Sequence, residues 1–235
     1  MLYWCFVRLI KIFISFIIVQ GVLFSCSTPE TSISEGKITY DITYPNPIED
    51  KWLERLMPKE MEMYFNPVDV KTEISFGLGM IQINYLTDFE NKQMYEMLKF
   101  MKKKNFALRD HDSIEQMISS IPEHKVKFYP DTKSIAGVLC KRAVVSVNGE
   151  IEPYSFDCWY TNQIKITEPN WCTPFKGIDG VLMQYRVERF NILMEFTANQ
   201  VSMEKVPKET FSVPEKYKQI STEAMKASLE ELKDI

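Results

Sequence analysis

The sequence predicts an α+β fold built on one large antiparallel sheet, and three observations support this class. Residues 36–44 place Ile38, Tyr40, Ile42 and Tyr44 on one face and polar residues on the other, as in a half-buried strand. Similar short runs return about every ten residues. The few helical patterns do not alternate regularly with the strands, which argues against a parallel sheet. An antiparallel sheet of this length tends to curl, so we expect a half-open barrel with a few helices covering its concave face.

Three helices are predicted between or after the strands. Residues 48–57 carry apolar side chains at helical spacing. Residues 113–121 repeat apolar side chains at the same period, and Asp112 or Ser113 is expected to cap their first turn. Ser221 is expected to cap a C-terminal helix. The sequence therefore predicts helices inserted into a run of strands.

The first 26 residues have the layout of an export signal. Arg8 and Lys11 precede residues 12–25, an uncharged run of 14 residues. A basic flank, a short apolar core and a small residue before the cleavage point define a secretory signal peptide. The uncharged run is shorter than the roughly 20 residues that cross a bilayer. The apolar residues 2–7 would lengthen it in the alternative case, an uncleaved anchor.

Leu23-Phe24-Ser25-Cys26 resembles the lipobox of bacterial lipoproteins. The resemblance implies that residues 1–25 are removed, that Cys26 is lipidated, and that acyl chains hold the mature protein at a membrane. Residues 26–35 would then be a lipidated tether, and residues 36–235 a single α+β domain. Ser27 after the cysteine resembles the outer-membrane sorting signal of such proteins. We therefore expect a cell-envelope protein anchored in the outer membrane and facing the periplasm.

The charge balance gives no reason to expect a nucleic acid partner. The chain has 28 Lys and Arg against 32 Asp and Glu, a net charge of −4, and loss of Arg8 and Lys11 with the signal makes it −6. The lysines are scattered, and Lys102-Lys103-Lys104 is the only run of them. A mildly acidic chain is not attracted to a phosphate backbone.

Two hairpins are predicted, one at Asn148-Gly149 and one across Asn199. The first lies between Cys140 and Cys158, two of the three cysteines that remain after the signal and the lipid site. One extra residue in that hairpin would place them directly opposite each other, within the span of a disulfide. Cys158 with Cys172 is the competing pair. Three reduced, buried cysteines are the remaining alternative.

No arrangement of residues predicts catalysis, a metal site or a cofactor. The two histidines, His111 and His124, both have carboxylate neighbours, but a zinc site needs three or four ligands at suitable spacing. His111 stands just before a predicted helix, where Asp112 serves as a cap. The motifs of serine hydrolases, dinucleotide sites and phosphate loops do not occur. We therefore expect a protein that is not an enzyme.

Residues 133–143, Lys-Ser-Ile-Ala-Gly-Val-Leu-Cys-Lys-Arg-Ala, resemble a segment of the GLPGLI family and its relatives, envelope proteins of Bacteroidota. Residues 159–164, Trp-Tyr-Thr-Asn-Gln-Ile, resemble a Trp-Tyr-Thr-x-x-Ile segment of that family. Residues 177–182, Gly-Ile-Asp-Gly-Val-Leu, stand where that family has Gly-Leu-Pro-Gly-Leu-Ile, without the proline. The likeness spans residues 36–217. It implies a LolA/LolB-like fold, in which helices close the hollow of a curled sheet, and it implies no catalytic residue.

Fold and composition together lead us to expect a non-enzymatic protein that binds an acyl chain or the lipid of a lipoprotein in the hollow of the sheet. The expected apolar lining comprises Tyr40, Ile42, Phe65, Ile83, Tyr85, Trp159 and Tyr185. The alternative is a structural or protein-interaction module that docks by a sheet edge or an exposed face. A carbon-lined cavity of roughly several hundred Å³ favours the first hypothesis. A filled core with an exposed apolar patch favours the second.

Overall fold

The structure of the protein, a computed structural model, describes residues 32–148, 152–189 and 192–234. The strands are β1 (Gly36–Thr43), β2 (Glu60–Phe65), β3 (Asp69–Phe76), β4 (Ile81–Asp88), β5 (Gln93–Phe100), β6 (Lys103–Arg109), β7 (His124–Ile135), β8 (Val138–Asn148), β9 (Pro153–Thr161), β10 (Val181–Arg189), β11 (Ile192–Ser202) and β12 (Lys218–Gln219). The helices are α2 (Lys51–Leu56), α3 (His111–Ser119), α4 (Thr222–Glu230), η2 (Lys208–Phe211) and η3 (Glu231–Asp234).

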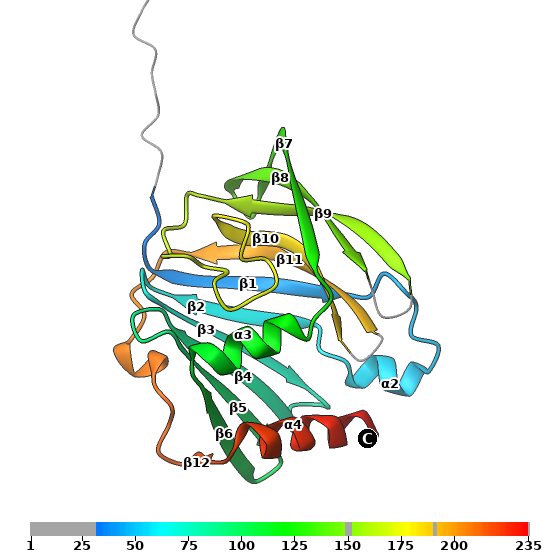
Figure 1. Ribbon diagram of the computed structural model, residues 1–235, viewed down its shortest axis with the longest axis vertical. Helices are drawn as coiled ribbons and strands as arrows, with labels where there is room; N and C mark the ends of the chain where they lie inside the picture. The colour runs from blue at the N-terminus through cyan, green and yellow to red at the C-terminus, as the bar shows by residue number, and fades with distance from the viewer. Residues whose placement is uncertain (1–31, 149–151, 190–191, 235) are drawn as a thin grey trace, which may run out of the picture. The chain divides into compact units, whose positions relative to one another are not determined.

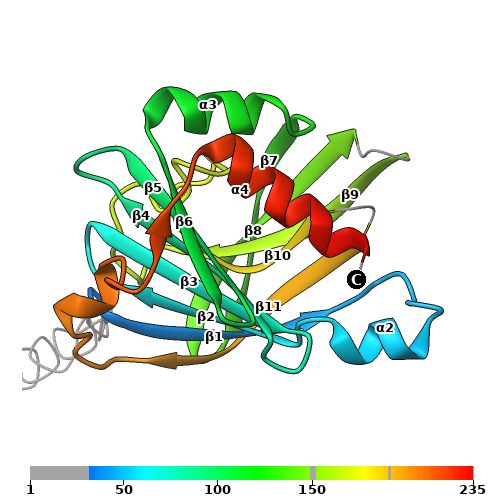
Figure 2. The ribbon, with the colours of Figure 1, turned by 90° about the horizontal axis from the view of Figure 1, so that it is seen from below.

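All twelve strands form one sheet, in the order β12-β6-β5-β4-β3-β2-β1-β11-β10-β9-β8-β7 (Figure 1). Neighbouring strands pair antiparallel, and β12 alone runs parallel to its neighbour, β6. β7 and β12 stand at the two edges, so the sheet is open and not closed into a barrel. The predicted antiparallel sheet with a few helices is confirmed, in the form of an open sheet that bends around α3 and α4 (Figure 2).

One face of the sheet is continuous from β1 to β5. The register pairs Tyr40 with Met61, Met61 with Ile74, Ile74 with Ile83, and Ile83 with Leu98. Directly opposed residues share a face of a sheet. The alternation of residues 36–44 therefore extends across five strands as one apolar surface. This surface, here called the inner face, is the one that α3 and α4 cover.

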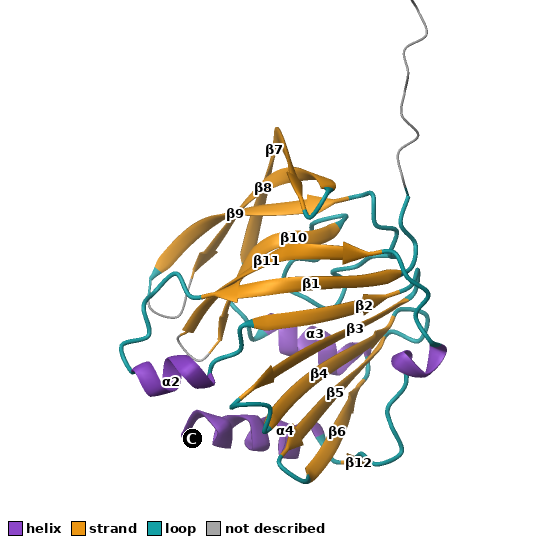
Figure 3. Ribbon diagram, turned by 180° about the vertical axis from the view of Figure 1, so that it is seen from behind, coloured by secondary structure: helices purple, strands orange, loops and turns teal. Residues whose placement is uncertain are grey.

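α3 and α4 each pack one stripe of apolar side chains against the inner face. α3 begins at Asp110, whose carboxylate accepts a hydrogen bond from the backbone N–H of Ser113 at 2.9 Å. The expected caps, Asp112 or Ser113, are thus wrong by two or three residues. Ile114 of α3 lies in one buried cluster, and Met225 of α4, fully buried, lies in another. Seen from behind, the strands lie in front of both helices (Figure 3).

α4 begins as the sequence predicts. The hydroxyl of Ser221 accepts a hydrogen bond from the N–H of Ala224 at 3.2 Å. α2 differs from the other two helices, because none of its residues is buried. Two of its apolar side chains, Trp52 and Leu53, are exposed. No described helix is both long enough and apolar enough to cross a membrane.

The predicted tether is shorter than expected on its domain side. Ile33 is 8% exposed; its N–H donates to the carbonyl of Gln163 at 2.8 Å and its carbonyl accepts from the N–H of Lys165 at 2.7 Å. The carboxylate of Glu35 accepts from the N–H of Val206 at 2.8 Å. Residues 32–35 therefore belong to the folded unit, because hydrogen bonds and apolar burial hold them there. Cys26 and the predicted signal lie outside the described residues.

Candidate functional site: an apolar end of the sheet

Exposed apolar side chains gather at one end of the sheet. Eight large apolar side chains are exposed among the described residues. Five of them lie on α2, on the β3–β4 turn and on the β5–β6 turn: Trp52 (60% exposed), Leu53 (37%), Leu78 (84%), Met80 (46%) and Met101 (60%). These five residues are here called the apolar end. Isolated exposed apolar residues are ordinary, whereas a group of them marks an interaction surface.

Backbone hydrogen bonds join the three segments of the apolar end. The N–H of Gly77 donates to the carbonyl of Leu56, the last residue of α2, at 2.8 Å. The N–H of Met101 donates to the carbonyl of Met80 at 2.9 Å. α2 and the two turns consequently lie side by side along one end of the strands (Figures 1 and 3).

The two turns hold their apolar residues in an unusual backbone conformation. Leu78 has a φ of 57° and Met101 a φ of 53°, both in the left-handed region. This conformation costs a residue with a Cβ about 1 kcal/mol. Neither side chain repays that cost by burial, since Leu78 is 84% and Met101 60% exposed. The packing of the folded domain therefore does not explain why these two turn positions carry a leucine and a methionine.

Positive charge surrounds the β5–β6 part of the apolar end. Lys99, Lys102, Lys103 and Lys104 flank Met101 in the chain. The pKa of Lys104 is lowered, first by partial desolvation and then by the positive charges of Lys216 and Lys99. The sequence showed the lysine run but gave no sign that it lies beside α2 and the β3–β4 turn.

Two other exposed apolar residues lie at the opposite end of β1. Met203 follows Ser202, which pairs with Lys37 near the start of β1. The N–H of Leu139 donates to the side chain of Gln163 at 2.9 Å, close to the point where Ile33 docks. α2 follows the far end of β1. Met203 and Leu139 are thus comparable apolar residues outside the apolar end.

All seven residues predicted to line an apolar hollow belong to the buried clusters or pack against them: Tyr40, Ile42, Phe65, Ile83, Tyr85, Trp159 and Tyr185. Phe65 is fully buried, and the hydroxyl of Tyr40 donates to the carbonyl of Leu182 at 2.9 Å. The ring of Tyr185 stacks on Phe196 with the centroids 5.0 Å apart. Burial raises the pKa of Tyr40, and it raises that of Tyr85 to about 12. These side chains fill a core.

Trp159 packs against the same buried cluster as Tyr40, but it differs from the other six in the face of the sheet on which it lies. Its strand neighbours Cys158 and Tyr160 lie in a cluster on the inner face with Ala143, and adjacent residues of a strand point to opposite faces. Trp159 therefore leaves the sheet on the outer face, opposite Arg142. The ammonium of Lys133 lies 4.3 Å from the centre of its ring. Its prediction as a lining residue is wrong, because one position in a strand changes the face.

The structure has a cleft of about 410 Å³, and none of the seven predicted residues lines it. The cleft lies between α3, the β4–β5 turn and residues 168–179, and most of its lining side chains are polar or charged. It differs in position and in chemistry from the expected carbon-lined hollow.

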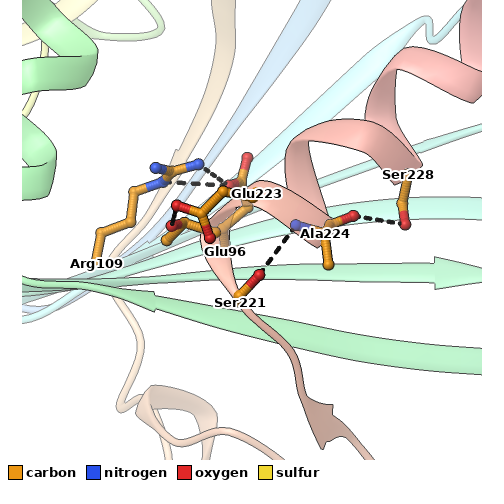
Figure 4. Close-up of polar contacts among 7 residues, drawn as sticks. Glu96, Arg109, Ser221, Glu223, Ala224 and Ser228 are labelled. Carbon is orange, nitrogen blue, oxygen red and sulfur yellow. Dashed lines mark hydrogen bonds and ion pairs between the residues drawn. The ribbon is translucent and has the colours of Figure 1, made fainter.

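The inner face also holds a buried ion pair that the sequence analysis missed. Glu96 and Arg109 face each other beneath the first turn of α4, near Glu223 (Figure 4). The positive charge of Arg109 adds to the hydrogen bonds from the backbone and from Ser221 and Thr222 that lower the pKa of Glu223. The available signal was the position of Glu96 between Met94 and Leu98, which puts a carboxylate on an apolar strand face.

The structure contradicts both predicted disulfides. Cys140, Cys158 and Cys172 are free and buried. Cys158 faces Ala143, not Cys140. Because Cys140 is three positions from Ala143, its side chain leaves the strand on the other face. Cys172 packs beneath α3, in a different cluster from Cys158. Gly149 of the predicted hairpin lies outside the described residues, and the pairing of Asn148 with Pro153 shows that the connection is longer than two residues.

Neither histidine stands in a cluster of possible ligands. Nδ1 of His111 is 3.8 Å from the carboxylate of Asp112, and both side chains are exposed. Nδ1 of His124 is 2.8 Å from the carbonyl of Pro122, and its ring packs edge-on against Phe175. Within residues 32–148, 152–189 and 192–234, no three His, Cys, Asp or Glu side chains come together as a metal site would require.

The chain matches no protein-family model, and no curated protein matches its sequence. The likeness of residues 133–182 to the GLPGLI family therefore stays a prediction from the sequence. The same holds for the lipid anchor and the envelope location.

Proposed function

We propose that this protein is a non-enzymatic, membrane-tethered protein of the cell envelope that docks on a lipid surface through its apolar end. One observation carries the proposal: five of the eight exposed large apolar side chains lie together on α2 and two neighbouring turns. A group of this kind is unfavourable in water and stabilising in contact with an apolar phase.

The shape of the apolar end favours a lipid surface over a protein partner. Leu78 and Met101 stand on two separate turns, and Trp52 on a short exposed helix. Such projecting side chains enter the boundary between headgroups and acyl chains, whereas protein partners select flatter, contiguous patches. The lysines beside Met101 would stay at the headgroups and attract anionic lipids.

The predicted anchor strengthens this proposal. Lipidated Cys26 would hold the protein at a membrane through a tether that enters the fold at the start of β1, away from the apolar end. Two membrane contacts bind far better than one, since the second contact forms at high effective concentration. A lipid tether and an apolar end at opposite ends of β1 suit a protein that binds a membrane at two points.

The carrier hypothesis receives less support from the structure. The side chains expected to line the hollow fill the core, and none of them lines the cleft, where most of the residues are polar or charged. A filled core with an exposed apolar patch is the pattern we expect of a docking module.

Vesicle flotation tests the docking proposal directly. The unit from Ser32 onward, which is compact by itself, should float with phosphatidylcholine vesicles that contain phosphatidylglycerol. Because burial of one such side chain contributes about 1.5 to 3 kcal/mol, Leu78→Ser should weaken binding roughly 10- to 100-fold. Leu139→Ser and Met203→Ser make the same kind of change outside the apolar end and should have no effect.

Two results would reject vesicle docking: the unchanged unit fails to float, or the three substitutions weaken binding equally. The first result would leave a protein partner as the occupant of the apolar end. The anchor has a separate test in cells fed an alkyne-bearing palmitate. The full chain should become labelled and its Cys26→Ala variant should not; equal labelling of both would contradict the anchor.

A further inference from the structure

We propose that the cleft beside α3 is a binding site for a neutral sugar unit. The cleft, of about 410 Å³, is bounded by His111 and Glu115 of α3, by Lys92 of the β4–β5 turn, and by Trp171 and Asp179 of the segment that follows β9. It lies away from the apolar end, because α3 follows the other end of β6. The proposal is independent of docking on lipid.

Asn170 makes one wall of the cleft rigid. The residue is 6% exposed, and its Nδ2 donates to the carbonyls of Ile178 and Gly180 at 2.8 and 2.9 Å. These two bonds use both of its N–H groups and hold the segment after β9 in a closed loop. Among the described residues, no group donates to the amide oxygen of Asn170. The amide oxygen is thereby left available as an acceptor at the lining of the cleft.

Trp171 supplies an apolar wall. It packs against the buried cluster of Ile114 and Cys172, so its ring is held in place. The ammonium of Lys92 lies 5.0 Å from the ring centre and 3.5 Å from that of Phe89. An indole fixed at the side of a polar cleft offers a flat surface to the C–H face of a sugar ring.

Both ammonium groups of the cleft are already paired. Lys92 bonds the carboxylate of Glu168 at 3.2 Å, and Lys176 bonds that of Glu115 at 3.1 Å. An anionic ligand would have to break one of these pairs. Asp179, the third carboxylate of the lining, has no ion pair among the described residues and can accept hydrogen bonds from hydroxyl groups. A neutral ring with several hydroxyls suits these groups, because each hydroxyl can donate to a carboxylate and accept from an ammonium without breaking a pair.

Fluorine NMR of the full chain labelled with fluorotryptophan tests the site, in a detergent without a sugar headgroup. Trp171→Phe identifies the signal of Trp171, and the signal of Trp159, on the outer face, serves as the control in the same molecule. The probes are methyl glucoside, methyl galactoside and N-acetylglucosamine, with glucosamine and glucuronate as charged comparators. We expect a saturable shift of the Trp171 signal with a neutral probe and none of the Trp159 signal.

Asp179→Ala, which removes an exposed acceptor from the lining, should raise the dissociation constant roughly tenfold or more. An unchanged spectrum of the other tryptophans shows that this variant is folded. The proposal is overturned if no neutral probe gives a saturable shift, if only a charged comparator does, or if Asp179→Ala binds as well as the unchanged chain.

Discussion

Glu96 and Arg109 form an ion pair on the inner face of the sheet, with Nη2 of Arg109 2.9 Å from Oε2 of Glu96. The two side chains are only 4% and 14% exposed. Removing two charges from water is costly, and the mutual attraction together with the hydrogen bonds offsets that cost. The pair thus belongs to the packing of this face, and either partner alone would be a buried, uncompensated charge.

Loss of one partner should therefore be far more damaging than loss of both. Arg109→Met leaves the Glu96 carboxylate unpaired and should lower the free energy of unfolding by about 3–5 kcal/mol. The double variant Glu96→Gln with Arg109→Met should cost much less than the sum of the two single changes. Denaturant titration of the four proteins measures this coupling.

The exposed pair of Arg142 with Asp157 is the matched control. Its atoms are 2.8 Å apart, but its side chains are 30% and 49% exposed, so Arg142→Met should cost less than about 1 kcal/mol. Equal losses for Arg109→Met and Arg142→Met would contradict the buried character of the first pair.

The three buried thiols should be unreactive in the folded protein. Burial raises the pKa of Cys140 to about 11, and of Cys158 and Cys172 to about 12. Since the thiolate is the reactive form, a thiol reagent near pH 8 should modify none of them in the native unit from Ser32. In denaturant without reductant, all three should react. Fewer than three reactive thiols after unfolding would show that a disulfide had formed.

Gly180 is expected to be intolerant of any side chain. A Cβ at this position would stand 2.7 Å from a ring carbon of Tyr160 and 2.8 Å from the carbonyl oxygen of Thr161. Gly180→Ala should therefore lower the free energy of unfolding by roughly 1–3 kcal/mol, as overpacking does. Gly177, in the same loop, has no atom within 4 Å of such a Cβ. Gly177→Ala is the control and should not be destabilising; equal losses for both variants would rule out the steric explanation.

Local patterns predicted the strands and failed where a bulge interrupts them. The alternation from Ile38 to Ile42 predicted β1, because one face of that strand is buried and the other is not. Residues 192–206 were instead predicted as a hairpin across Asn199. β11 is one strand through Asn199, since Thr39 pairs with Gln200 and Tyr40 with Ala198, which leaves Asn199 as the extra residue of a bulge.

The apolar end could not be predicted from the sequence, for a different reason. The helical period of residues 48–57 showed that one face is apolar, but a period does not show what lies against that face. Only the placement of α2 beside the β3–β4 and β5–β6 turns reveals that Trp52 and Leu53 are uncovered. Likewise, the sequence placed Glu96 among apolar residues, yet its partner Arg109 comes from the next strand.

His124 should make the stability of the protein depend on pH below neutrality. Burial lowers its pKa in the folded state, although the hydrogen bond to the carbonyl of Pro122 acts in the opposite direction. The unfolded state then binds the proton more readily, so the free energy of unfolding should fall as the pH drops through about 6.5. Because the ring is only partly buried, we expect a loss of less than about 1 kcal/mol. Urea titrations between about pH 7.5 and 5.5 should show a smaller loss for His124→Gln. His111 is the control, because its side chain is 58% exposed. His111→Gln should lose as much free energy of unfolding between these pH values as the unchanged protein. An equal loss in the two variants would exclude His124 as the origin of the pH dependence.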